Sequence, residues 1–161
     1  MGNQWKEYID TFIHLANKHG VRMLMVGGGA VNFHGYQRHS ADVDFWIDIE
    51  AVNLEKLAAV FREMGYAIES FPDAVGQKEQ NISVKFSPVD LNLELITRFE
   101  IGKTFDQAYD EGEEVQLEKD RVIRWRVLNF DDLIESKRRA ARPKDLLDIL
   151  ALKSLNPDKS E

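Results

Sequence analysis

The sequence contains no cysteine, which excludes disulfides, a thiolate nucleophile and a cysteine-bound zinc site. It also has no run approaching the roughly 20 apolar residues that a membrane-spanning helix needs. The opening residues, MGNQWKEYIDTF, carry neither the basic nor the apolar segment of a signal peptide. We therefore expect a cytoplasmic protein that does not enter the membrane, and a reducing compartment fits the absence of cysteine.

Positive charge is also scarce. The chain has 21 Lys and Arg residues against 28 Asp and Glu residues, so its net charge is −7. This balance disfavours a dedicated nucleic-acid-binding protein but does not exclude a local basic patch. The length of 161 residues suits a single domain over residues 1–161. Within it we expect a sheet core at about 20–128 and C-terminal helices at 129–155.

Hydrophobic spacing predicts an alternation of helices and strands along the chain. Helices are predicted at 3–19, 30–35, 53–64, 131–139 and 143–155. Strands are predicted at 21–26, 42–48, 81–86, 89–97, 113–118 and 121–128. Residues 70–79 are expected to form a loop, and the tail NPDKSE is expected to fray. The pattern predicts an α+β fold, a mixed β-sheet flanked by helices with a C-terminal helical pair.

Gly27 and Gly28 stand between a predicted strand and a predicted helix. Glycine permits positive φ and has no Cβ to block a ligand, while the N–H groups of a following helix favour anions. A tight turn that binds nothing is the alternative. Two familiar phosphate-binding motifs fail, because Asn32 stands where the third glycine of G-x-G-x-x-G should be and no G-K-[S/T] occurs.

Asp42 and Asp44 lie on one face of a predicted strand, because alternate residues of a strand share a face. Two like charges about 6 Å apart repel by about 3 kcal/mol at an effective dielectric near 20, and a divalent cation between them removes this repulsion. Oxygen ligands favour Mg²⁺ or Mn²⁺. A strand end exposed to water is the alternative. Asp48 is expected to be a turn or cap residue.

The spacing of these two motifs resembles a known signature. Gly27-Gly28, 13 further residues and then Asp42-Val43-Asp44-Phe45 are similar to the pattern of the polymerase-β-like nucleotidyltransferase superfamily. The longer string VGGGAVNFHGYQRHSADVDFWI and the ending DLIESKRRAARPKDLLDILAL resemble its bacterial abortive-infection and toxin-type branch, the type IV toxin–antitoxin nucleotidyltransferases. Ser40 replaces the usual threonine of that branch. The resemblance covers about residues 20–155.

The resemblance implies a metal-dependent enzyme that transfers an NMP from an NTP to a hydroxyl group on RNA, protein or a small molecule. Asp42 and Asp44 would bind both metal ions, Mg²⁺ or Mn²⁺, and Asp90 would be the third carboxylate. Gly27 and Gly28 would hold the triphosphate through their backbone N–H groups.

Three carboxylate or amide side chains alternate in the strand that follows. Asp90, Asn92 and Glu94 share one face of VDLNLELIT. Asp90 matches the family position, and Glu94 is the alternative third carboxylate. A solvated polar face remains an interpretation for Asn92 and Glu94.

Basic residues should neutralise the polyphosphate. Arg38, Ser40 and Lys137 match family positions and are expected near the nucleotide phosphates, although Arg38 could instead form an ion pair. Lys137 lies on the core-facing side of its predicted helix, so it either snorkels or reaches a cleft. Asp145 also matches the family motif, and the alternative that we favour is a pair with Arg142, three residues before it.

A non-catalytic module of the same fold is the second hypothesis. It would bind a nucleotide or a protein, as an antitoxin or regulator does. The intact Asp42, Asp44 and Asp90 favour the enzyme. A cognate antitoxin or regulator is the protein partner that the resemblance implies, and the sequence does not indicate an oligomeric state.

Overall fold

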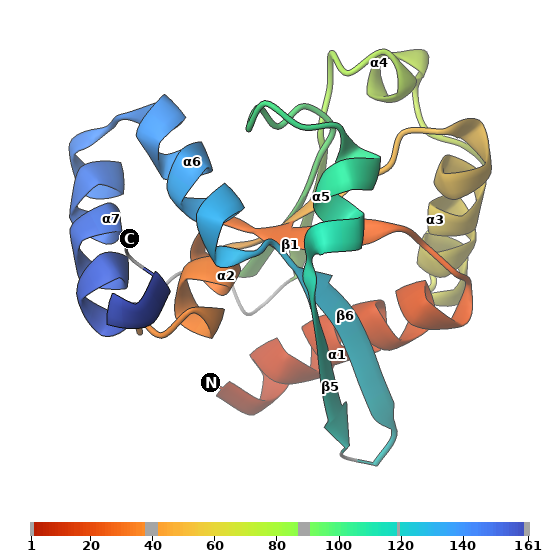
Figure 1. Ribbon diagram of the computed structural model, residues 1–161. Coiled ribbons are helices and arrows are strands. Elements are labelled where there is room, and N and C mark those ends of the chain that lie inside the picture. The colour runs from red at the N-terminus through yellow and green to blue at the C-terminus, as the bar shows by residue number, and fades with distance from the viewer. Residues whose placement is uncertain (1, 38–41, 87–90, 119, 160–161) are drawn as a thin grey trace.

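The computed structural model describes residues 2–37, 42–86, 91–118 and 120–159 (Figure 1). The helices are α1 (Gly2–Lys18), α2 (Gly27–Phe33), α3 (Ala51–Glu63), α4 (Asp73–Gly76), α5 (Phe105–Glu111), α6 (Phe130–Ala140), α7 (Pro143–Leu155) and the 3-10 helix η1 (Pro157–Lys159). The strands are β1 (Met23–Val26), β2 (Asp42–Ile47), β3 (Ile82–Phe86), β4 (Leu91–Ile96), β5 (Glu113–Glu118) and β6 (Val122–Val127). Among these described residues, none of the helices is long and apolar enough to cross a membrane.

The strands form one six-stranded sheet in the order β3-β4-β2-β1-β6-β5. β1 pairs parallel with β6, β2 pairs parallel with β4, and the remaining pairs are antiparallel. The predicted mixed sheet is therefore confirmed. All four residues of β1 are buried, which fits its short apolar run and its position inside the sheet.

Helices cover both faces of the sheet. On one face, the ring of Phe12 in α1 lies 6.0 Å from that of Phe45 in β2 and 5.7 Å from that of Phe61 in α3. Side chains alternate along a strand, so Trp46 points to the opposite face. There its ring lies 5.2 Å from that of Phe105 in α5. Asp42 and Asp44 belong to the same face as Trp46.

The predicted C-terminal helical pair is confirmed by α6 and α7. The two helices pack against each other, and α6 also contacts α2 (Figure 1). Figure 1 shows α6 and α7 together on one side of the molecule and α3 on the opposite side. The C-terminal pair is thereby joined to the helix that follows β1.

Three local expectations are wrong. α4 forms a single turn inside the segment 70–79, which was expected to be a loop, and η1 orders part of the tail that was expected to fray. The sequence pattern also omits α5. This helix begins with a capping box, in which Thr104 Oγ1 accepts from the backbone N–H of Gln107 and the Gln107 side chain accepts from the N–H of Thr104.

Candidate active site

Antiparallel pairing of β1 and β2 brings the glycines to the aspartates. Val26 is the register partner of Asp44, so Gly27 follows β1 at the edge of the sheet where β2 begins. Gly27 has φ +61°, and a Cβ added to it would collide with Oδ2 of Asp44 and lie 3.3 Å from its Cγ. The absence of a side chain at Gly27 therefore makes room for the Asp44 carboxylate.

The glycines lie within a helix rather than before it. α2 begins at Gly27, whereas the predicted helix begins at residue 30. Gly28 is buried in its first turn, and the turn has no acidic side chain.

Asp44 carries negative charge in an unfavourable place. Burial raises the pKa of its carboxyl to about 6, with further contributions from the neighbouring charges of Asp42 and Glu94, while Lys137 and Lys144 act in the opposite direction. Sequence spacing does not single out Lys144. Carboxylates held close together despite their mutual repulsion are typical of sites for cation binding or catalysis.

The parallel neighbour β4 adds two polar side chains to this edge. Asn92 is opposite Asp42 and donates from Nδ2 to Asp42 Oδ1 at 3.0 Å. Glu94 is opposite Asp44, and its Oε2 accepts a 2.8 Å hydrogen bond from Ser83 Oγ in β3. Glu94, the alternative third carboxylate, thus lies directly across from Asp44. The predicted residues Asp90, Arg38 and Ser40 lie outside the described part of the chain.

Lys137 is buried on the core-facing side of α6, so it does not snorkel. Its Nζ lies 3.0 Å from Asp148 Oδ2 and 3.4 Å from Asp145 Oδ1, both in α7. The ammonium of Lys137 therefore forms ion pairs that join α6 to α7. Lys137 still favours the charged form of Asp44 electrostatically, and its predicted contact with phosphate stays a prediction.

The predicted pairing of Asp145 with Arg142 is confirmed. Arg142 donates from its backbone N–H at 3.1 Å and from Nε at 2.6 Å to Asp145 Oδ2. Burial alone would raise the pKa of Asp145, but these hydrogen bonds and the charge of Lys137 hold it below its ordinary value. Asp145 is thus an anchor of the α6–α7 junction.

Asp48 is a turn residue, as predicted. Its Oδ1 accepts from the backbone N–H of Glu50 at 3.0 Å, and its Oδ2 accepts from Arg22 Nε at 3.1 Å. These contacts hold the chain between β2 and α3, so the Asp48 carboxylate has a structural role.

The residues at this edge suit a divalent cation. Aspartate oxygens are the donors that Mg²⁺ and Mn²⁺ prefer, and the raised pKa of Asp44 is the sign of negative charge that a cation would neutralise. In the segments that the structure describes, no three His, Asp or Glu side chains are grouped as a metal site. Asp90, the predicted third ligand, is outside those segments.

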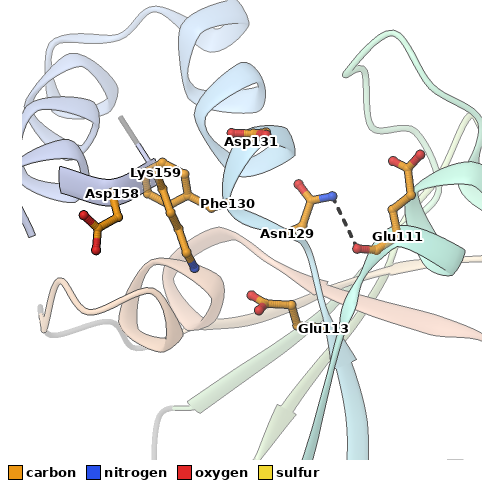
Figure 2. A pocket seen from close by; sticks show the side chains of 7 residues that line it. All are labelled: Glu111, Glu113, Asn129, Phe130, Asp131, Asp158 and Lys159. Carbon is orange, nitrogen blue, oxygen red and sulfur yellow. Dashed lines mark hydrogen bonds between the residues drawn. The ribbon is translucent and has the colours of Figure 1, made fainter. Parts of the chain in front are cut away.

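A pocket of about 560 Å³ lies elsewhere (Figure 2). Its lining residues are Glu111, Glu113, Asn129, Phe130, Asp131, Asp158 and Lys159. Four carboxylates face one lysine there, which disfavours a polyphosphate. Figure 2 shows Asn129 donating to the backbone carbonyl of Glu111, at 3.3 Å. None of the described candidate site residues lines this pocket.

In comparisons with known proteins, no family model matches the chain and no curated protein matches it.

Proposed function

We propose that this protein is a metal-dependent nucleotidyltransferase that transfers an NMP from an NTP to a hydroxyl group on RNA, protein or a small molecule. The observation that carries the proposal is the close approach of the Gly27 backbone to the carboxylate of Asp44, whose pKa is raised to about 6. A tight turn alone needs no such carboxylate, and a solvated strand end needs no glycine packed against it.

In the proposed reaction, the acceptor hydroxyl oxygen forms a bond to the α-phosphorus of the NTP. The bond from that phosphorus to the oxygen bridging to the β-phosphorus breaks, pyrophosphate leaves, and the hydroxyl proton passes to a base. Divalent ions supply charge stabilisation when bound. Asp42 and Asp44 would hold Mg²⁺ or Mn²⁺, and the backbone N–H groups of Gly27 and Gly28 would hold the triphosphate.

Asp90 is our proposed third ligand, and Glu94 is the alternative because it lies across from Asp44. Comparing Asp90→Asn with Glu94→Gln separates the two. Loss of Mn²⁺ binding in the first variant alone supports Asp90, and loss in the second alone supports Glu94.

Metal binding can be measured without knowing the acceptor. We expect Mn²⁺ to bind the wild-type chain in electron paramagnetic resonance titrations and Mg²⁺ to raise its melting temperature. Asp44→Asn should abolish both effects. Asp48→Asn is the control, because Asp48 is bound to Arg22 and Glu50 and should leave metal binding unchanged. Equal metal binding by the wild type and Asp44→Asn would show that the site assignment is wrong.

Transfer itself requires labelled NTPs, Mg²⁺ or Mn²⁺, and total RNA or total protein as acceptor. Covalent attachment of the label to RNA or protein by the wild type, but not by Asp44→Asn, would support the enzyme. Metal-dependent NTP binding without attachment would favour the non-catalytic nucleotide-binding module. If the label is not attached and no metal-dependent NTP binding is seen, both the enzyme and the non-catalytic nucleotide-binding module are excluded.

A role in a toxin–antitoxin pair extends this proposal. Such a toxin would act in the cytoplasm, and its partner would be a cognate antitoxin or regulator. We expect controlled expression of the wild-type chain to arrest bacterial growth and Asp44→Asn at the same level to be harmless. Equal growth with both proteins would argue against the toxin and leave the enzymatic proposal to its own test.

A further inference from the structure

Asn92 is the uncharged residue in the polar series Asp90, Asn92 and Glu94. On β4 it lies directly opposite Asp42 of β2, and its Nδ2 donates to Asp42 Oδ1 at 3.0 Å. The nucleotidyl transfer proposed above assigns Asp42 to the metal ion and leaves Asn92 without a role. The hydrogen bond between them indicates what that role is.

The two candidate metal ligands of β2 are held in place differently. The backbone of Gly27 approaches the Asp44 carboxylate so closely that a Cβ at Gly27 would collide with it. Asp42 is exposed at the first position of β2, where the side chain has room to change rotamer. An ion that binds a mobile carboxylate must first restrict it, and this weakens binding. The hydrogen bond from Asn92 restricts Asp42 before an ion arrives.

The chemistry of the Asn92 side chain suits this task. Its Nδ2 group is an uncharged donor, so it orients the carboxylate without changing the charge of the site. A carboxylate at position 92 would repel Asp42, and an ammonium there would compete with the metal ion for it. A carboxylate has about four lone-pair positions, so Asp42 can accept this N–H and still coordinate a cation.

The sheet fixes the position of the amide. β4 lies between β2 and β3, and its register with β2 runs from the pair Asp42–Asn92 to the pair Trp46–Ile96. Leu93, the next residue of β4, is fully buried. Consecutive side chains of a strand point to opposite faces, so the burial of Leu93 directs Asn92 to the face of Asp42. The donor therefore lies on a rigid element, as the hydrogen-bond partner of a metal ligand requires.

We propose that Asn92 is a positioning residue of the metal site, whose Nδ2–H group orients the Asp42 carboxylate for Mg²⁺ or Mn²⁺. The inference rests on the proposed function only in that Asp42 binds the ion. It does not depend on the NTP, the acceptor or the transfer step. The competing role is a cross-strand pair that stabilises β2 against β4 and does not affect the ion.

Asn92→Thr and Asn92→Val separate the two roles. Threonine and valine have nearly the same shape and both favour strands, but only threonine can donate to Asp42. Titration of the full chain with Mn²⁺, followed by electron paramagnetic resonance, gives the affinity without any substrate. We expect Asn92→Val to weaken Mn²⁺ binding at least about tenfold, the usual loss when the partner of a metal ligand is removed. Asn92→Thr should retain most of the wild-type affinity.

A second cross-strand hydrogen bond provides the matched control. On β5, Gln116 Oε1 accepts from Arg124 Nη2 of β6 at 2.8 Å, and β6 and β1 separate this strand from β2. Gln116→Val removes that bond and should leave the affinity for Mn²⁺ unchanged. Urea unfolding with a chelator present should give Asn92→Val and Asn92→Thr similar midpoints. A difference between them in Mn²⁺ affinity then reports on the donor and not on folding.

The outcomes separate this inference from the metal site itself. Weak Mn²⁺ binding by Asn92→Val with near wild-type binding by Asn92→Thr would support the positioning role. Equal affinities in these two variants, whether strong or weak, would refute it. If the wild type binds Mn²⁺ and Asp44→Asn does not, such a refutation leaves the metal site standing. A wild-type chain that does not bind Mn²⁺ would overturn both.

Discussion

At the residue scale, Asp44 holds a carboxylate where ionisation is unfavourable. Its folded-state pKa of about 6 lies above the ordinary value of 3.8. The stability that its protonated form contributes is therefore fully present below pH 3.8 and is lost as the pH rises through about 6. The proposed metal binding by Asp44 would conflict with stability, a conflict that is usual for catalytic carboxylates.

Asp44→Asn should consequently stabilise the metal-free protein. The shift of this pKa corresponds to about 3 kcal/mol, and solvent screening at the partly exposed carboxylate reduces the effect to about 1–2 kcal/mol at pH 7. At pH 4 the variant should gain nothing, because the wild-type carboxyl is already protonated. Urea unfolding at both pH values, with a chelator present, measures the difference.

Asp48→Asn, in the loop after the same strand, should change the free energy of unfolding in the opposite direction. It weakens the ion pair with Arg22 and should destabilise the protein by about 0.5 kcal/mol at pH 7. If Asp44→Asn were destabilising as well, Asp44 would be a structural carboxylate, and the electrostatic argument for a cation site would fail.

Gly27→Ala tests the close approach of backbone and carboxylate. We expect a loss of about 1–2 kcal/mol from the positive φ, and a further loss because Cβ must displace the Asp44 side chain. Metal binding should fall with it. Gly20→Ala isolates the backbone effect, since Gly20 has φ +71° but its nearest neighbour would be Lys56 Nζ at 3.7 Å. Equal losses in the two variants would show that Asp44 is not constrained by Gly27.

At the element scale, the junction of α6 and α7 depends on buried ions. Lys137→Met removes the ammonium from Asp145 and Asp148 and should cost about 3–5 kcal/mol in the free energy of unfolding. Arg138→Met, at the next position of α6, breaks only an exposed pair with Glu135 and should cost less than about 1 kcal/mol. Chemical denaturation of both variants gives the comparison.

Asp148→Asn in the Lys137→Met background should recover part of the loss, because it removes one of the two buried carboxylates that lose the lysine ammonium. A Lys137→Met variant as stable as Arg138→Met would contradict the structural role. Normal stability with reduced NTP binding would instead support the predicted contact of Lys137 with phosphate.

Local sequence patterns predict most of the helices and strands, because the spacing of hydrophobic residues and the turn residues involve near neighbours in sequence. The capping box at Thr104 was a readable signal for α5, but the helix is short and lies among irregular segments. Strand order was not predictable. The parallel pairing of Met25 with Val127 joins distant segments and depends on contacts made only in three dimensions.

The same division applies to the candidate site. A period of two predicts that Asp42 and Asp44 share a face, but the position of Glu94 across from Asp44 follows from the register of β2 with β4. The orientation of α7 was equally unpredictable. Helical spacing would place its leucines inward, whereas the aspartates are buried because Lys137 in another helix lies beside both of them and Arg142 pairs with Asp145.

At the scale of the whole molecule, the C-terminal helices are tied to the sheet core through α2. His34, at the end of α2, is buried, and its Nε2–H donates to the Leu128 carbonyl at 2.8 Å. Asn156, after α7, donates from Nδ2 to the His34 carbonyl at 2.8 Å. The first bond lies within the segment 20–128, at its boundary with α6, and the second links that segment to Asn156, which directly follows α7. They favour one cooperative unit, as the predicted single domain requires.

Leu152→Ala tests that cooperativity. Leu152 of α7 is fully buried, so its truncation should cost about 2–5 kcal/mol. All three tryptophans precede residue 129, so fluorescence reports on the remainder of the chain. We expect urea transitions followed by tryptophan fluorescence and by far-UV circular dichroism to shift together. Leu150→Ala, exposed two residues away, should move neither by more than about 0.5 kcal/mol. A loss of helical signal before an unshifted fluorescence transition would show that residues 129–155 unfold as a separate unit.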